Sequence, residues 1–508
     1  MGVLYQPGEG MTYGEEPEAL VRENAFIGKK TDLSPLPTFE GSVGAFPYPF
    51  IEGKEKYTDC YFAAWRTAFS NLKKATAASG FCSDFIDTAF NGFLFMWDSA
   101  FIVTYGKYGS RAFDFQSTLD NFYARQHPDG FICREICEDK SGDQFHRHDP
   151  SSTGPNVLPW AEWLYFENFG DALRIKKVFP PLLAYHRWLR EHRTWRDGSY
   201  WTTGWGSGMD NSPRVERGDD PRFSNGHMVW IDACCQMILS GKILYKMASL
   251  IGRENEARDV LDEALYLEKY VNEKMWDERE GFYFDLRRDG LSDVKTIASY
   301  WALVAGIVPP ERLERFVSHL TNKGEFMRPH APATLSADDP EYCPLGGYWR
   351  GSVWAPTTYM TLRGLDAAGY EDVAYKIAKC HHAAVCEVWE KTGTFWENYA
   401  PDVIDRGEKG KSDFVGWTGL PPIAVFLEYV IGIKPRGNEK TVVWRIRETA
   451  RHGVARYPLG KDTDLDLVCE ARESASVRPD VKVRVLRGGP VTVKVVWDGG
   501  EYEMRCAK

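Results

Sequence analysis

Two carboxylates lie in stretches whose composition suits an active site. Asp210 ends the run Tyr200-Trp-Thr-Thr-Gly-Trp-Gly-Ser-Gly-Met-Asp, and Glu397 lies within Thr394-Phe-Trp-Glu-Asn-Tyr399. Cleavage of a glycosidic bond uses such a pair, because one protonated carboxyl donates to the leaving oxygen and one carboxylate activates water or attacks directly. Aromatic neighbours that exclude water raise the pKa of a carboxyl, which suits an acid. We therefore expect Asp210 and Glu397 to meet in one site.

The residues around Asp210 suit sugar binding. Residues 206–208 are small and let a ligand approach the backbone closely, while Trp205 offers an apolar face to a sugar ring. Asn211 and Arg214 add hydrogen-bond donors beside the acid. The same composition is also typical of a surface turn, and a single glutamate such as Glu397 is often a surface or helix-terminal residue. Both structural alternatives stay open at this level.

Composition narrows the class of ligand. Lys plus Arg number 62 and Asp plus Glu number 72, which gives a net charge of −10 and argues against a surface that coats nucleic acid. The aromatic share of 14% favours a sugar-binding cleft. No apolar run is long enough to span a bilayer, and no motif indicates a metal or an organic cofactor; His146-x-His148-Asp149 lacks a second ligand cluster. The expected partner is a small carbohydrate.

Cysteine usage and the first residues suggest a compartment. The eleven cysteines are odd in number and irregularly spaced, which is typical of reduced thiols. The first twenty residues have neither a basic segment nor an apolar segment of the kind found in export signals. We therefore expect a cytoplasmic protein, and the sequence leaves its oligomeric state open.

The central part of the chain has the apolar periodicity of amphipathic helices. A helix begins near Tyr61, and further periodic runs cover 98–107, 112–125, 157–168, 171–193, 226–250, 253–274, 296–306, 309–322, 352–369, 370–390 and 417–431. The motif-bearing segments repeatedly precede a helix, so six helical hairpins closed into a ring would bring them together at one end. The expected fold is mainly α, an (α/α)6 toroid over 51–433, preceded by an extended lead-in over 1–50.

The pattern of apolar residues changes after Gly437. Runs such as Val481-Lys-Val-Arg-Val485 and Val491-Thr-Val-Lys-Val-Val-Trp497 alternate with the period of two expected of half-buried strands, and Asp498-Gly499 indicates a hairpin turn. We expect a small antiparallel, β-sandwich-like domain over 438–508 that packs on the toroid.

Five motifs together resemble a known clan of enzymes. They are Trp97-Asp-Ser99, Gly204-Trp-x-Ser-Gly-Met-Asp-Asn-Ser-Pro-Arg214, Tyr348-Trp-Arg-Gly351, Phe395-Trp-Glu-Asn-Tyr399 and Gly416-Trp-Thr-Gly419. In order and spacing they are similar to the inverting α-glycosidases that include glycoside hydrolase family 63 and the trehalases, and most similar to compact bacterial members such as the mannosylglycerate and glucosylglycerate hydrolases. The resemblance covers about residues 57–432.

The resemblance implies a role for each matching residue. It implies that Asp210 is the general acid and Glu397 the general base, and that Trp97 and Asp98 grip the non-reducing sugar. The other expected substrate-binding residues are Gln126, Trp205, Asn211, Arg214, Trp349, Arg350, Gly351, Trp396 and Trp417. The chain departs from the pattern at Gly206, where relatives usually carry a glutamate, so the resemblance does not carry over the sugar and aglycone preference of those relatives.

The function that follows is that of an inverting exo-α-glycosidase acting on a small α-glucoside or disaccharide. An α-mannosidase or mannosylglycerate-type hydrolase of the same fold is the nearest alternative. A carbohydrate-binding toroid without activity is an alternative from another class, although both carboxylates are present. A lyase or epimerase is a third, and it would call for a proton-abstracting His or Tyr in the cleft; the five motifs contain no His.

Overall fold

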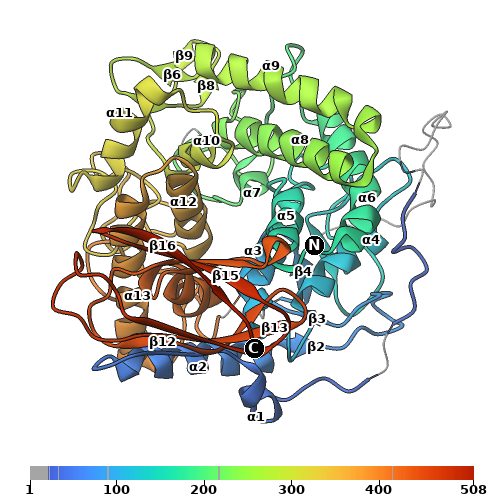
Figure 1. Ribbon diagram of the computed structural model, residues 1–508. Helices are drawn as coiled ribbons and strands as arrows, with labels where there is room; N and C mark the ends of the chain where they lie inside the picture. Colours follow the sequence, from blue (N-terminus) through green and yellow to red (C-terminus); the bar gives the residue numbers. More distant parts are fainter. Residues whose placement is uncertain (1–20, 22, 32–33, 89–90, 216–217, 415) are drawn as a thin grey trace.

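The computed structural model describes residues 21, 23–31, 34–88, 91–215, 218–414 and 416–508. The described chain is mainly helical, with a region of β-sheet built largely from the C-terminal residues (Figure 1). This confirms the expected mainly α fold with a C-terminal β region. The first twenty residues of the expected lead-in lie outside the described residues.

Six helices line the centre of the molecule, and each contacts the next around a closed cycle (Figure 1). In cycle order these inner helices are α3 (Met96–Gly106), α5 (Leu158–Phe169), α8 (Ile231–Ile251), α10 (Trp301–Val304), α12 (Ala355–Ala367) and the wider η7 (Leu420–Val430), which returns to α3. The helices outside them are α2 (Glu55–Ser70), α4 (Asp120–Ala124), α6 (Ala172–His192), α9 (Arg258–Lys274), α11 (Pro310–Thr321) and α13 (Glu371–Thr392).

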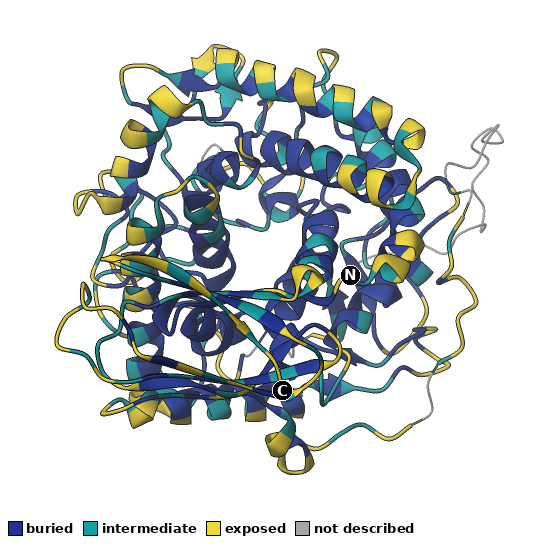
Figure 2. Ribbon diagram, viewed as in Figure 1, coloured by how far each residue is buried: buried dark blue, intermediate teal, exposed yellow. Residues whose placement is uncertain are grey.

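The residue pattern explains which helices lie inside. Every residue of α3 is buried, as expected of a helix whose faces are all covered by protein. By contrast, α9 buries Val260, Ala264, Leu267 and Val271, which recur at intervals of three and four and form one apolar stripe. Figure 2 shows the result: the inner helices are mostly buried, while the outer helices expose one face. Periodicity was therefore a good guide to these elements.

The expected helix over 112–125 is shorter than its periodicity suggested. The chain there forms a 3-10 turn, η3 (Phe115–Leu119), followed by α4. Two short elements complete the helical part, α1 (Phe39–Ser42) and α7 (Gly204–Ser207). The second of these precedes Asp210.

The β region consists of two four-stranded sheets. In spatial order, the first is β1 (Tyr48–Ile51), β12 (His452–Leu459), β13 (Thr463–Cys469) and β14 (Val481–Arg487), and the second is β10 (Ile433–Arg436), β11 (Thr441–Arg445), β15 (Val491–Trp497) and β16 (Gly500–Cys506). The expected hairpin turn at Asp498-Gly499 is confirmed, because Trp497 pairs with Gly500.

Two details of the sheets differ from expectation. Strand β1 belongs to the lead-in yet pairs with β12, so the N-terminal part of the chain completes a C-terminal sheet. Strands β11 and β15 are parallel, whereas a purely antiparallel region was expected. The reason is the connection between them, which passes through the other sheet before it returns in the same direction.

Four short two-stranded antiparallel sheets interrupt the helical part, and none of them was predicted. They are β2 (Leu72–Lys73) with β3 (Phe85–Ile86), β4 (Phe93–Phe95) with β5 (Glu135–Cys137), β6 (Trp276–Asp277) with β7 (Phe282–Tyr283), and β8 (Leu286–Arg287) with β9 (Gly290–Leu291). The β4–β5 pair leads directly into α3 and so helps to place the residues at the start of that helix.

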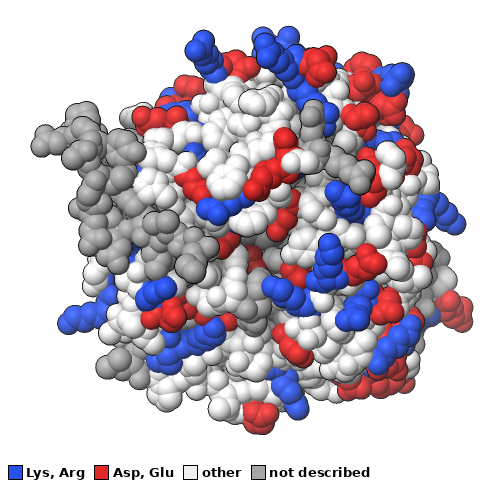
Figure 3. All heavy atoms as spheres, turned by 180° about the vertical axis from the view of Figure 1, so that it is seen from behind, with Lys and Arg blue, Asp and Glu red and all other residues white. Residues whose placement is uncertain are grey.

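The described residues show no membrane-spanning helix and a surface of mixed charge. Within the part of the chain that is described, no helix has both the length and the apolar character needed to cross a bilayer. The face seen in Figure 3 is hollowed near its centre, and acidic and basic side chains are interspersed over it.

Candidate active site

One cavity of about 370 Å³ brings the two candidate carboxylates together. Seven of the residues predicted from the sequence line it: Trp97, Asp98, Trp205, Asp210, Trp349, Glu397 and Trp417. The remaining walls come from Asn91, Phe95, Arg134, Glu135, Gln144, Phe145, Gly154, Pro155, Gly208, Tyr348, Trp354 and Lys411. A cleft of this kind, aromatic with a few convergent polar groups, is typical of a small-molecule site.

The short helix α7 delivers Asp210 to the cavity. Its N-terminus is capped by Thr203, whose hydroxyl accepts from the N–H of Gly206 at 2.9 Å. Gly208 ends the helix with φ of +76°, a left-handed conformation that glycine adopts without strain, and so turns the chain toward Asp210. Burial raises the pKa of Asp210 to about 6, and the negative charge of Glu397 acts in the same direction while Arg134 opposes it.

The carboxyl of Glu397 is held at both oxygens. Its Oε1 accepts from the hydroxyl of Tyr348 at 2.9 Å, and its Oε2 accepts from the backbone N–H of Lys411 at 3.3 Å. The indole of Trp417 donates to the Glu397 carbonyl oxygen at 2.9 Å and fixes the backbone. Burial raises the pKa of Glu397, but the Tyr348 hydrogen bond and the positive charge of Lys411 oppose that rise. These contacts favour the ionised form.

Tyr348 has an unusual backbone. Its φ is +68°, in the left-handed region that residues with a side chain rarely adopt, and its neighbours Gly346, Gly347 and Gly351 also have positive φ. Strained conformations of this kind persist when surrounding contacts impose them, and they cluster at functional sites. Here the conformation brings the Tyr348 hydroxyl to Glu397.

Trp97 and Asp98 line the cavity from the start of α3. Asp98 is buried in the first turn of that helix. Burial raises the pKa of Asp98 well above its usual range, and the charges of Glu397 and Glu135 add to the rise. A carboxyl in this position can accept hydrogen bonds from two sugar hydroxyls, or donate one when it is protonated.

Sequence reasoning missed Arg134 and Glu135, which lie at the start of β5. Glu135 pairs with Phe95 of β4, so its side chain lies beside the start of α3. The Arg134 guanidinium lies 2.8 Å from Glu135 Oε1 and donates to the Ser151 carbonyl at 2.7 Å. Burial raises the pKa of Glu135, and the charge of Asp210 contributes. In the sequence, the only signal for this pair is that an arginine and a glutamate are adjacent shortly after Gly130 and Phe131.

Two residues beside the acid have structural partners. The amide of Asn211 bonds to the backbone of Gly347 and Trp349, and Asn211 does not line the cavity. Arg214 is fully buried, and each of its two carboxylate partners, Asp232 and Asp285, receives two hydrogen bonds at 2.7–2.8 Å. The sequence placed both residues in contact with the substrate because they follow Asp210, whereas the chain turns them away from the cavity.

Three further predicted residues also lie outside the lining. Gln126 is buried and donates to the carbonyl oxygens of Gly130 and Pro181 at 3.0 and 2.7 Å. The Trp396 indole donates to the Thr392 hydroxyl at 3.1 Å. Gly351 has φ of +134°, and a side chain there would meet Tyr342 at 2.8 Å. Each serves the packing of a loop.

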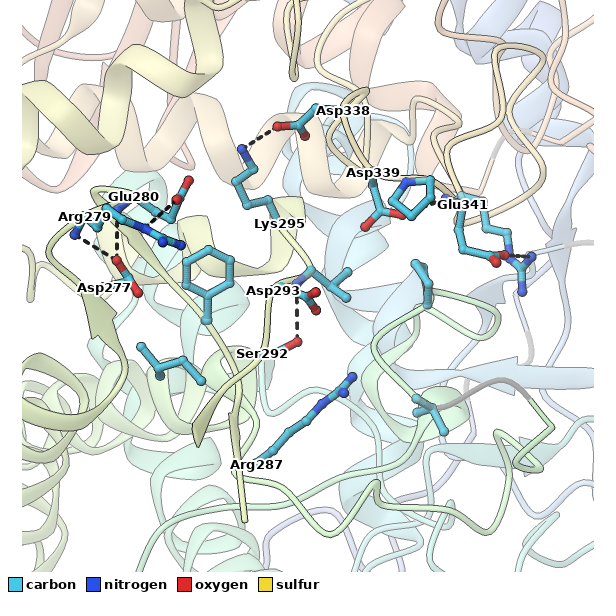
Figure 4. Close-up of a pocket in the computed structure, with 17 residues that line it drawn as sticks. Asp277, Arg279, Glu280, Arg287, Ser292, Asp293, Lys295, Asp338, Asp339 and Glu341 are labelled. Carbon is cyan, nitrogen blue, oxygen red and sulfur yellow. Dashed lines mark hydrogen bonds and ion pairs between the residues drawn. The ribbon is translucent and has the colours of Figure 1, made fainter. Parts of the chain in front are cut away.

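Arg350 lines a different cavity, of about 790 Å³, shown in Figure 4. Pro213 and Val215, from the loop that follows Asp210, also line this cavity. The segment from Asp210 to Val215 therefore contributes residues to both cavities. Several of its charged groups pair with one another: Lys295 lies 2.7 Å from Asp338, and Arg350 lies 2.6 Å from Glu341. Neither candidate catalytic carboxylate lines it.

The arrangement in the smaller cavity suits acid–base hydrolysis. One carboxyl has a pKa near neutrality, and the other is held by two hydrogen bonds, as expected of an acid and a base. Among the described residues, no group of three or more His, Cys, Asp and Glu side chains is placed to hold a metal ion.

Comparison with known proteins identifies the family. A model described as the mannosylglycerate hydrolase MGH1-like glycoside hydrolase domain matches residues 92–418, more than half of the chain. A mannosylglycerate hydrolase of Thermus thermophilus is 28% identical over 401 residues, which cover 65% of this chain and 93% of that protein. A probable mannosyl-oligosaccharide glucosidase of Schizosaccharomyces pombe is 25% identical over 48% of this chain and 34% of its own length.

Solved structures agree in fold. The crystal structure of the GH63 mannosylglycerate hydrolase from Thermus thermophilus in complex with glucose aligns with a TM-score of 0.57 at 23% identity, over 71% of this chain and 98% of that one. The residues matched by the family model include Asp210, Glu397 and most of the residues that line the cavity. The chain is a glycoside hydrolase and belongs to the MGH1-like family.

Proposed function

We propose that the protein is an inverting exo-α-glycosidase in which Asp210 is the general acid and Glu397 the general base. Asp210 donates its proton to the leaving oxygen as the glycosidic bond breaks, and Glu397 takes a proton from the water that attacks the anomeric carbon from the other face. The product is released with inverted configuration, and the two carboxyls return to their starting protonation states by exchange with solvent.

The observation that carries the proposal is the contrast between the two carboxyls in one cavity. Burial raises the pKa of Asp210 to about 6, and no side chain among the described residues hydrogen-bonds to its carboxyl. Glu397 accepts two hydrogen bonds that stabilise its ionised form. Burial raises the pKa of both carboxyls, and at Glu397 the hydrogen bond from Tyr348 opposes the rise. Two carboxyls in such different environments are the pattern of an acid–base pair.

We propose a small α-glucoside or disaccharide as the substrate. The cavity of about 370 Å³ is of a size for one small glycoside, and its aromatic walls at Trp97, Trp205 and Trp417 suit sugar rings. The mannosyl-oligosaccharide glucosidase relative supports a glucoside.

A mannosylglycerate-type substrate is the second candidate, and two observations favour it. The matching family model and the Thermus thermophilus relative both carry that activity in their names. The cavity also contains two cationic side chains among its described lining residues, Arg134 and Lys411, which suit an anionic aglycone such as glycerate.

The architecture that supports this function is, in our proposal, an (α/α)6 toroid over 51–433 with a β-sandwich-like domain over 438–508. The closed cycle of inner helices and the aligned mannosylglycerate hydrolase structure support it. All eleven cysteines are free thiols, which supports a reducing compartment such as the cytoplasm.

The test is turnover of a panel containing α-glucosides, α-mannosides, glucosylglycerate and mannosylglycerate. We expect one member to be hydrolysed, and both Asp210→Asn and Glu397→Gln to lose at least about a hundredfold in kcat while they still bind that substrate. Binding of a panel member without turnover by the unmodified protein would instead support an inactive carbohydrate-binding toroid.

A further inference from the structure

The side chain of Asn211 joins the loop of the acid to the loop of Tyr348. Its Nδ2 donates to the Gly347 carbonyl oxygen at 3.0 Å, and its Oδ1 accepts from the Trp349 backbone N–H at 2.8 Å. These partners lie 136 and 138 positions later in the chain. Both polar atoms of the amide are thus used on backbone groups, and Asn211 does not line the catalytic cavity.

The two hydrogen bonds lie on either side of Tyr348, the residue whose φ is +68°. Fixing the carbonyl before Tyr348 and the N–H after it restricts the backbone torsions on both sides of that residue. The Trp354 indole adds a third bond, to the Tyr348 carbonyl oxygen at 3.2 Å. Asn211 therefore helps to impose a conformation that a tyrosine rarely adopts on its own.

The same conformation determines what Tyr348 does. Its hydroxyl donates to Glu397 Oε1 at 2.9 Å, one of the two hydrogen bonds that the carboxyl receives. A continuous path of bonded groups thus runs from the residue next to the acid, through Tyr348, to the base. Arg350 strengthens the junction, because its Nε donates to the Asn211 carbonyl oxygen at 3.2 Å.

We propose that Asn211 is a positioning residue that orients the base Glu397 through Tyr348 and so couples the acid loop to the base. The amide does not touch the substrate; it fixes the loop that carries the tyrosine. The kinetic consequences rest on the proposed function, whereas the geometric claim is independent of it.

The kinetic test is a double-mutant cycle between Asn211→Ala and Tyr348→Phe. Because a small displacement of a catalytic group is costly, we expect Asn211→Ala to lower kcat about 10- to 100-fold with little change in KM, and to move the low-pH limb of the kcat profile upward. The double variant should be no more than about twofold slower than Tyr348→Phe alone. Fully additive losses would overturn the proposal, as would a raised KM with unchanged kcat, the sign of direct substrate contact.

The matched control is Ser212→Ala in the same loop. The Ser212 hydroxyl is buried and has no hydrogen-bond partner among the described residues, so its removal should leave kcat and the pH profile unchanged. If Asn211→Ala does not fold, Asn211→Asp replaces it, since it keeps an acceptor for the Trp349 N–H and loses the donor to Gly347.

A crystal structure of the Asn211 variant gives a readout that needs no turnover. We expect the separation between the Tyr348 hydroxyl and Glu397 Oε1 to exceed about 3.5 Å, so that the hydrogen bond is lost. A variant in which this hydrogen bond persists would overturn the proposal. If the unmodified protein hydrolyses no glycoside, the proposed function fails, while this distance still decides the role of Asn211.

Discussion

The hydroxyl of Tyr348 donates to Glu397 Oε1 at 2.9 Å, which links a tyrosine in a left-handed backbone conformation to the candidate base. The bond lowers the pKa of Glu397 against the effect of burial. Removing it in Tyr348→Phe leaves the pKa of Glu397 higher than before. The base is then ionised only at higher pH, so the low-pH limb of the kcat profile should move upward.

The same variant should lose about 10- to 100-fold in kcat, because hydrogen bonds to charged groups contribute about 1.5–3 kcal/mol. The measurement is kcat as a function of pH on the substrate that the panel identifies. Tyr342→Phe is the matched control: its hydroxyl donates to Asp402 at 3.0 Å, away from the catalytic cavity. An unchanged low-pH limb in Tyr348→Phe would contradict this role.

The high-pH limb depends on Asp210, which must be protonated to act as an acid. With the pKa of Asp210 at about 6, the activity of the free enzyme should fall as the pH rises through that value. The positive charge of Arg134 lowers this pKa. Arg134→Met should therefore move the high-pH limb of kcat/KM upward.

The control for Arg134→Met is Arg279→Met, which removes an exposed arginine from the other cavity. It should leave both limbs in place. A downward shift of the high-pH limb in Arg134→Met would mean that a group other than Asp210 controls it.

Arg214 should matter chiefly for stability. It is fully buried between Asp232 and Asp285. Its positive charge offsets the cost of burying the two negative charges. Arg214→Met leaves two buried carboxylates without their partner, which should cost about 3–5 kcal/mol in the free energy of unfolding. Denaturant unfolding monitored by circular dichroism measures this loss.

A more exposed ion pair provides the comparison for Arg214. Lys494→Met breaks the pair with Glu501, in which the lysine and glutamate side chains are 33% and 60% exposed, and should cost less than about 1 kcal/mol. Equal losses in the two variants would show that the buried triad does not stabilise the fold in the way its geometry implies.

Much of the fold could be predicted from periodicity. The spacing of apolar residues located most of the helices to within a few residues, as for α6 and α13, because burial on one side of a helix imposes that spacing. The pairing of β4 with β5 could not be predicted in this way. The two strands are three residues long and lie forty positions apart, so their pairing depends on contacts distant in sequence.

The residues of the candidate site likewise fall into those that local motifs predict and those that depend on contacts distant in sequence. Trp97, Asp98, Asp210 and Glu397 lie in distinctive local motifs, and the structure brings them to one cavity. Asn211 and Arg214 were expected there because they follow the acid in sequence, but neighbours in a turn point in different directions. Arg134 and Glu135 were missed because only the pairing of β5 with β4 places them near α3.

The measurement that tests the central claim most directly is proton NMR of the anomer first released during hydrolysis by the unmodified protein, with Asp210→Asn and Glu397→Gln alongside. An inverting enzyme with this acid and this base should release the β-anomer first from an α-glycoside, and both variants should lose that signal. Initial release of the α-anomer would contradict the account, because retention requires a double displacement in which a carboxylate such as Glu397 attacks as a nucleophile.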